Sequence, residues 1–115
     1  MAFFHLVPVD ASTGRPRPEP ASVGDYPKTG GFYAVRSADE VDTAKLATVI
    51  EATARTHKLA EGIFVTRSLL WGFPDIAHVW EEDGNVHVFS HLVYGRSDLG
   101  VNKKRVEAWL SAASK

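Results

Sequence analysis

Residues 74–93 read PDIAHVWEEDGNVHVFSHLV, and this stretch gives the strongest indication of the fold. Apolar and polar side chains alternate on both sides of Asp83-Gly84. The favoured two-residue hairpin turn needs positive φ at both of its central positions, and Asp-Gly is one of the pairs that supplies it. We therefore predict two antiparallel strands, over residues 76–81 and 86–93, joined by a tight turn.

This turn also fixes which side chains share a sheet face, because successive residues of a strand point to opposite sides. The turn puts Trp80 opposite His87, and the next two pairs follow from it: His78 with Phe89, and Ile76 with His91. One face then carries imidazoles and aromatic rings, from His78, Trp80, His87, Phe89 and His91. The other face is small and mainly aliphatic, and we expect helices to pack on it: Ala77, Val79, Val86, Val88, Ser90 and Leu92.

Outward from the hairpin, the pattern alternates between helix and strand. Phe32 to Arg36 and Ile63 to Trp71 have the composition of strands. Ser37 and Glu40 form a capping-box signature ahead of a helix over residues 41–57, and Ser97 or Asp98 caps a second helix over residues 99–113. The sequence predicts an α+β fold, a mainly antiparallel sheet of about four to five strands with two helices packed on one face.

The first 31 residues differ in composition from the rest. Residues 10–31 hold four prolines and four glycines, which disfavour regular helix, and residues 3–9 form an apolar stretch with the pattern of a strand. We divide the chain into an N-terminal strand and Pro/Gly-rich arm, residues 1–31, and a single α+β domain, residues 32–115. The arm is expected either to drape over the surface or a second subunit, or to be a mobile tail.

Composition excludes several classes of protein. The chain has 115 residues, no Cys, 13 Lys+Arg against 14 Asp+Glu and a formal charge of −1, so disulfide scaffolds, thiol catalysis and nucleic acid as the main partner are not expected. No apolar run approaches the roughly 20 residues of a membrane helix. We also find no signal peptide at the N-terminus and therefore expect a cytoplasmic protein with no membrane partner.

The three histidines of the aromatic face are the candidate catalytic residues. Imidazole titrates near neutral pH and serves as general acid or base. A metal is not expected, because His87 and His91 lie four residues apart on one strand, about 13 Å, and no metal-binding spacing is present. Nor does any motif call for a cofactor. These histidines and the aromatic rings beside them form a ligand pocket in the first interpretation. In the alternatives they form a subunit interface or an ordinary exposed face.

The segment before the last helix is expected to be structural. Asp98 can accept hydrogen bonds from the free N–H groups of the helix start, and Arg105 can pair with Asp98 or Asp75 to hold the helix on the sheet. A binding site for an anion at this helix N-terminus, with Arg96 adding charge, is the alternative.

Two stretches resemble a known family. Residues 95–106, GRSDLGVNKKRV, are similar to the C-terminal signature of the domain of unknown function 1499 family, and residues 66–75, TRSLLWGFPD, look like its strand and F-x-D turn. The resemblance covers residues 39–113 and implies a small α/β unit with no established reaction or cofactor. It also implies that Ser97, Asp98, Asn102 and Arg105 are scaffold. Where the family has arginines and serines on the strand before Gly95, this chain has FSHLV, so we expect a divergent member whose polar strand has become an apolar pocket or interface.

Two functions remain open at this point. The first is a small-molecule-binding protein for an apolar or aromatic ligand, either a binding protein alone or a cofactor-independent acid–base enzyme of isomerase or cyclase type. In it, His78, His87 or His91 moves the proton, and the ligand is bound by Trp71, Trp80, Phe89, Tyr94 and Arg96. The second is a non-catalytic module, a homodimer or partner-binding domain that uses the aromatic sheet face and the N-terminal arm.

Overall fold

The predicted hairpin forms the centre of the sheet. The structure, a computed structural model, describes residues 9–68, 72–95 and 97–115. Strands β5 (Pro74–Glu82) and β6 (Asn85–Leu92) pair antiparallel, with Trp80 opposite His87. Asp83 and Gly84 both have positive φ, 54° and 76°, as this type of turn requires. The register predicted from the sequence is confirmed.

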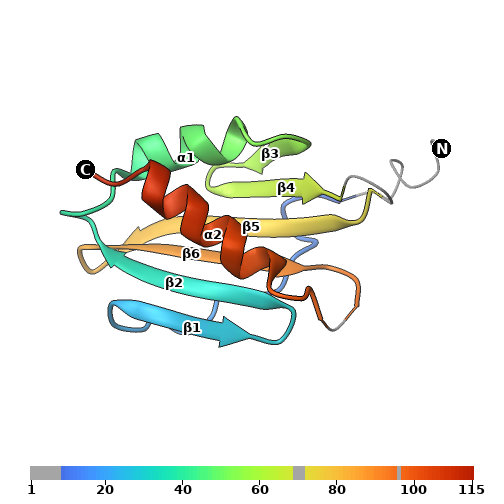
Figure 1. Cartoon of the computed structure of the whole chain (residues 1–115), viewed down its shortest axis with the longest axis horizontal. Coiled ribbons are helices and arrows are strands. Elements are labelled where there is room, and N and C mark those ends of the chain that lie inside the picture. Colours follow the sequence, from blue (N-terminus) through green and yellow to red (C-terminus); the bar gives the residue numbers. More distant parts are fainter. Residues whose placement is uncertain (1–8, 69–71, 96) are drawn as a thin grey trace.

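Around the hairpin lies one antiparallel sheet of six strands within the described residues, in the order β1-β2-β6-β5-β4-β3 (Figure 1). The four outer strands are β1 (Gly24–Lys28), β2 (Gly31–Ser37), β3 (Thr56–Ala60) and β4 (Ile63–Arg67). The α+β class and the antiparallel sheet are confirmed, whereas the expected count of four to five strands is wrong.

The two edge strands, β1 and β3, account for the difference. β1 lies inside the stretch expected to be irregular, and its Pro27 stands opposite Phe32. Proline has no N–H to donate, but an edge strand tolerates it because one side of the strand has no partner. β3 occupies residues that were expected to end a helix. Arg55 has a φ of 57°, which ends the preceding turn and lets the chain reverse into the sheet.

The first helix is correspondingly shorter than predicted, because α1 spans Thr43–Glu51 rather than residues 41–57. Its N-cap is Asp42, whose carboxylate accepts a hydrogen bond from the backbone N–H of Lys45 at 3.0 Å. Ser37, predicted to cap this helix, instead accepts a bond from the N–H of Asp39 within a turn. The capping box with Glu40 is therefore wrong.

The second helix, α2 (Val101–Ala112), begins two residues later than predicted. Gly100, with a φ of 78°, occupies the N-cap position and has no side chain to act as a cap. Asp98 nevertheless accepts a hydrogen bond from the N–H of Asn102 in the first turn, at 3.0 Å. The expectation that Asp98 satisfies this helix start is confirmed, although it does so from two residues ahead of the cap.

Both helices pack on the same face of the sheet, as Figure 1 shows. Their buried side chains, among them Leu46, Ile50, Val106 and Trp109, meet the aliphatic face of the hairpin in the main core. Neither of the helices described is long and apolar enough to cross a membrane.

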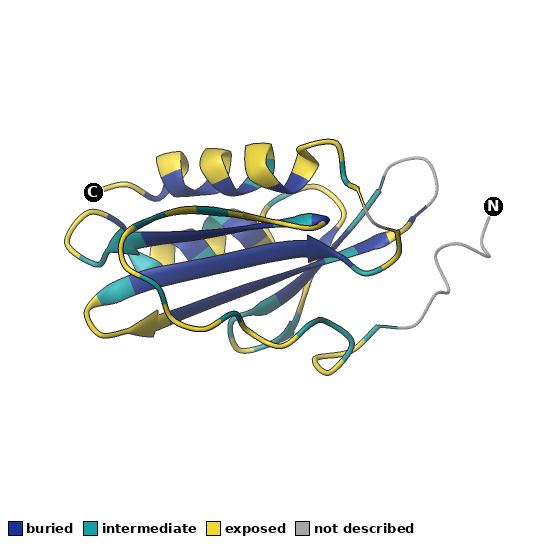
Figure 2. Ribbon diagram, turned by 90° about the horizontal axis from the view of Figure 1, so that it is seen from below, coloured by how far each residue is buried: buried dark blue, intermediate teal, exposed yellow. Residues whose placement is uncertain are grey.

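The opposite face of the sheet is covered by the N-terminal arm. Residues 13–23, here called the strap, run along this face before the chain enters β1 (Figure 2). Of the expectations for the arm, draping over the domain's own surface is the one observed. The strand expected over residues 3–9 falls almost entirely outside the described residues.

Candidate functional site

The residues predicted to share the aromatic face form one continuous layer, here called the histidine layer: His78, Trp80, His87, Phe89, His91 and Tyr33 from β2. The rings stack along the sheet, with centroids 5.8 Å apart for His78 and His91 and 5.0 Å apart for Trp80 and His87. The hydroxyl of Tyr33 lies 2.7 Å from Nδ1 of His87. The structure therefore brings the three candidate catalytic histidines onto one face.

The strap lies directly on this layer. Nε2 of His91 accepts a hydrogen bond from the N–H of Arg15 at 3.2 Å, and the guanidinium of Arg17 sits 4.6 Å from the ring centre of Trp80. The three histidines are buried, with exposed fractions of 6% or less. An ordinary exposed face is therefore excluded, and the layer is a second small core rather than an open cavity.

Burial also sets the charge state of two of these histidines. It lowers the pKa of His78 to about 4, with further lowering by the nearby His91 and Arg17. Burial lowers the pKa of His91 as well, against the opposing effect of its bond to the carbonyl of Leu92. Both imidazoles are neutral at pH 7 and closed off from solvent. Their predicted catalytic role stays a prediction that requires the strap to move.

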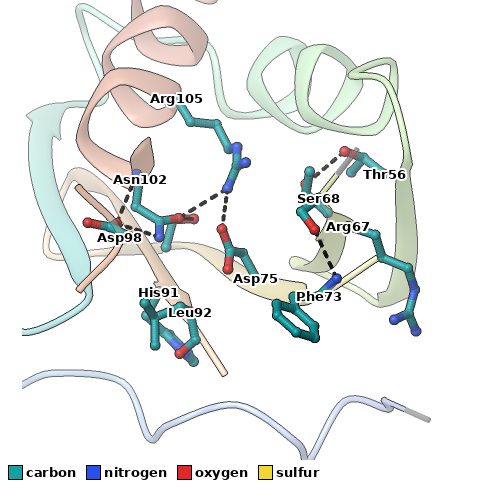
Figure 3. A network of polar contacts seen from close by, with 12 residues as sticks. Thr56, Arg67, Ser68, Phe73, Asp75, His91, Leu92, Asp98, Asn102 and Arg105 are labelled. Atoms are coloured by element: carbon teal, nitrogen blue, oxygen red, sulfur yellow. Dashed lines mark hydrogen bonds and ion pairs between the residues drawn. The ribbon is translucent and has the colours of Figure 1, made fainter. Parts of the chain in front are cut away.

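A second cluster lies on the helix face, where β5 begins and α2 starts (Figure 3). Arg105 of α2 donates from Nη1 to Asp75 at 2.8 Å and to the side-chain oxygen of Asn102 at 3.3 Å. Asn102 is fully buried and also accepts a hydrogen bond from the hydroxyl of Ser90. Of the two partners expected for Arg105, Asp98 and Asp75, the structure has Asp75, and this pair joins α2 to the sheet.

Two carboxylates of this cluster have opposite pKa shifts. Burial raises the pKa of Asp75, and this outweighs the lowering caused by Arg105. Burial also acts to raise the pKa of Asp98, but hydrogen bonds from Asn102 and Gly100 together lower it. Asp75 is thus the carboxyl of the cluster that takes up a proton more readily.

Asp75 and Arg105 of this cluster form the floor of a pocket of about 220 Å³. Three large side chains on its rim are strongly exposed: Phe73 at 45%, Tyr94 at 54% and Val101 at 45%. The remaining lining residues come from the β4–β5 segment, β6, the β6–α2 loop and α2: Ser68, Asp75, Leu92, Ser97, Asp98 and Arg105. An apolar rim over a few converging polar groups is typical of small-molecule sites.

A wider hollow of about 540 Å³ lies between α1 and the β3–β4 turn. Its charged lining residues, Arg17, Glu61 and Glu81, are all exposed, and no buried ion pair lies in it. None of the three candidate histidines lines either hollow. In the part of the chain that the structure describes, no group of three or more His, Asp or Glu side chains could hold a metal ion.

The candidate site residues thus fall into two groups on opposite faces of the sheet. Of the predicted ligand-binding residues, Trp80 and Phe89 lie under the strap and Tyr94 lies on the pocket rim, whereas Trp71 and Arg96 lie outside the described residues. The pocket residues predicted to be structural are Asp75, Ser97, Asp98 and Arg105.

Sequence reasoning missed Ser68 and Phe73 as lining residues and Tyr33 as the partner of His87. The F-x-D pattern was the available signal for Phe73. For Tyr33, the alternation within β2 separates its two faces, but only the pairing with β6 shows which face meets the histidines.

Comparison with known proteins gives a family and no activity. Residues 18–112 match the model of a family described as "Protein of unknown function (DUF1499)". Searches of curated proteins and of solved structures returned no match. Both stretches that carry the family resemblance, residues 66–75 and 95–106, contribute side chains to the pocket.

Proposed function

The chain belongs to the DUF1499 family, whose description assigns no activity, and we propose from the geometry that it binds a small molecule in the pocket floored by Asp75 and Arg105. The ligand class is an apolar or aromatic body that carries one hydrogen-bond-accepting group. The proposal rests on one observation: beneath an apolar rim lies a partly buried arginine with N–H donors that bond to none of the described residues.

Arg105 supplies the polar end of this site. Both of its side-chain hydrogen bonds use Nη1, and among the residues that the structure describes Nη2 and Nε donate to no group. A guanidinium has five N–H donors in a fixed plane, so a planar acceptor such as a carboxylate or carboxamide can bind two of them together. The pairing with Asp75 holds the guanidinium in place before the ligand arrives.

The rim supplies the apolar end. Phe73, Tyr94 and Val101 expose large apolar or aromatic surfaces, while Leu92 is buried beside them. A volume of about 220 Å³ lies below the roughly 300–1,000 Å³ of drug-sized sites, so the expected ligand is the size of a single substituted ring. This keeps the aromatic ligand predicted from the sequence and moves it to the other face of the sheet.

Any acid–base step in this pocket runs through Asp75. Its carboxyl lines the pocket, and burial raises its pKa above the usual value of an aspartate, which favours uptake of a proton. Turnover is not required for the binding proposal. The alternative of a partner-binding module gains no support from the aromatic face, because the strap occupies it.

Calorimetric titration with benzoate, benzamide and benzylamine tests the proposal. Benzoate and benzamide present an acceptor to Arg105 and should bind, whereas benzylamine presents a cation and should not. Arg105→Met should remove benzoate binding. The control is Arg36→Met. It breaks a comparable ion pair elsewhere in the sheet, between Arg36 and Asp25 at 2.7 Å. Equal binding of all three probes, or unchanged benzoate binding by Arg105→Met, would overturn the proposal.

A further inference from the structure

We propose that the strap is an acid-released cover: protonation of His91 detaches residues 13–23 from the sheet and exposes the aromatic surface of the histidine layer. This inference concerns the opposite face of the sheet from the pocket and does not depend on the proposed function. It follows from the hydrogen bonds of one imidazole and from the charges that face it.

The two ring nitrogens of His91 have fixed and different roles. Nδ1 lies 3.0 Å from the carbonyl oxygen of Leu92, which can only accept, so Nδ1 carries the proton. Nε2 is then the lone pair that accepts the N–H of Arg15 at 3.2 Å. Protonation of Nε2 turns this acceptor into a donor that faces another donor. The bond that anchors the strap is lost in the same step.

The strap passes very close to two imidazoles at Gly14. A Cβ at this position would lie 3.1 Å from Nε2 of His78, 3.1 Å from Nε2 of His91 and 3.0 Å from Ile76. Nε2 of His78 is buried and has no hydrogen-bond partner within the described residues. Two basic nitrogens therefore converge beneath one glycine, and neither has room for a water molecule or counter-ion while the strap is in place.

The charges around these two rings would repel a proton. The strap contributes Arg15 and Arg17, which disfavour the charged forms of His91 and His78 respectively, and the His91 ring further disfavours the charged form of His78. From β3, the exposed His57 shares this sheet face through the strand register.

Carboxylates do not offset these positive charges. The carboxylate of Asp10 is held within its own turn by Ser12, and Glu82 contacts Trp80 at the far end of the layer. No carboxylate in the described part of the chain bonds to either imidazole. A proton on His91 or His78 therefore favours a state in which the ring reaches water, and that state requires the strap to leave.

Beyond the bond to His91, few contacts of the strap reach the histidine layer. The N–H of Ala21 donates to the hydroxyl of Tyr33 at 3.3 Å, Ala21 packs on the apolar part of the layer, and Arg17 lies over Trp80. Arg15 also donates to the carbonyl of Thr29 at 2.6 Å. When the strap leaves, the newly exposed surface is apolar and aromatic, because its main buried residues are Tyr33, Val35, Trp80 and Phe89.

Thiol labelling tests the release, since the chain has no cysteine of its own. Ala21→Cys places a thiol against the histidine layer. Ser22→Cys places a thiol on the neighbouring exposed residue, where it reports how pH alone changes the rate of the labelling reaction. The reagent is 4,4′-dithiodipyridine, which reacts in acid as well as at neutral pH. Between pH 7.5 and 4.5 the ratio of the two labelling rates should rise as the pH falls, by up to about tenfold per pH unit for each imidazole that takes up a proton when the strap opens.

Four further variants separate strap release from other causes. His91→Gln cannot titrate, so it should flatten the rise, and His78→Gln should flatten it in part. Gly14→Ala should open the strap already at pH 7.5, because its Cβ would press on both imidazoles. Ala77→Cys, buried on the helix face, should stay unlabelled throughout. A ratio that does not change with pH, a rise that both glutamine variants retain, or labelling of Ala77→Cys in parallel would each overturn the proposal.

Discussion

Replacing Arg105 by methionine removes the guanidinium that pairs with Asp75 and keeps most of the aliphatic side chain. The ion pair is 2.8 Å long, and its two side chains are 19% and 18% exposed. Removing one partner of a fully buried pair costs about 3–5 kcal/mol. Because solvent reaches about a fifth of each side chain here, we expect Arg105→Met to lower the free energy of unfolding by about 2 kcal/mol at pH 7.

The pH dependence of this loss is the more specific prediction. Burial already raises the pKa of Asp75, and without Arg105 it rises further. A group with a raised pKa in the folded state stabilises the protein below its unfolded pKa and loses that contribution as pH rises through the folded value. The deficit of Arg105→Met should therefore shrink toward acid pH, by at most about 1.4 kcal/mol per unit.

Urea unfolding followed by tryptophan fluorescence, at pH 5, 6, 7 and 8, measures the deficit against the unmodified protein. The histidines titrate equally in both proteins, so their contribution cancels in the difference. Asp75→Asn in the Arg105→Met background should recover most of the loss, because no charge is then left buried. A deficit below about 0.5 kcal/mol would contradict a stabilising ion pair between Arg105 and Asp75. A deficit that is the same at every pH would contradict the predicted rise in the pKa of Asp75.

Three further predictions concern stability. Asp98→Ala removes the acceptor of three hydrogen bonds at the start of α2 and should lower the urea midpoint by an amount equivalent to about 1–2 kcal/mol; an unchanged midpoint would show that water replaces them. Tyr33→Phe leaves Nδ1 of His87 without its buried partner and should cost about 2 kcal/mol in the same assay, whereas a neutral effect would contradict that bond. Because the pKa of His78 is lowered in the folded protein, the unfolded chain binds one more proton than the folded chain between about pH 6.5 and 4. The free energy of unfolding should therefore fall as the pH drops through this window, by about 2 kcal/mol from pH 7 to 5. His78→Gln should reduce that slope, and an identical slope would contradict the assignment.

The hairpin and its two faces could be predicted from the sequence because the information there is local. Asp83-Gly84 fixes the turn, and the period of two then assigns every side chain of β5 and β6 to a face. Asp75 could be named as one of two partners of Arg105, because Arg105 lies beside the apolar stripe of a helix and Asp75 lies at the start of a strand. These predictions needed only short-range patterns and the layering of helices on a sheet.

The strands β1 and β3 and the strap depend on contacts that local patterns do not encode. Pro27 disfavours a strand by itself, but pairing at an edge overrides that preference. Thr56 to Ala60 continue a helix-compatible sequence, and positive φ at Arg55 ends it. The position of the strap could not be predicted, because Gly14 and Arg15 fit the histidines only once β5 and β6 are paired. For that reason a pocket, a subunit interface and an exposed face all remained open for these histidines.

The central claim is that the pocket floored by Asp75 and Arg105 binds an aromatic molecule with an acceptor group. Titration of the ¹⁵N-labelled protein with benzoate, followed amide by amide in heteronuclear NMR spectra, tests it most directly. We expect shifts centred on the pocket residues Phe73, Asp75, Leu92, Ser97 and Val101, and we expect Arg105→Met to lose them. Shifts centred on the strap and the histidine layer, or no shifts at millimolar benzoate, would contradict it.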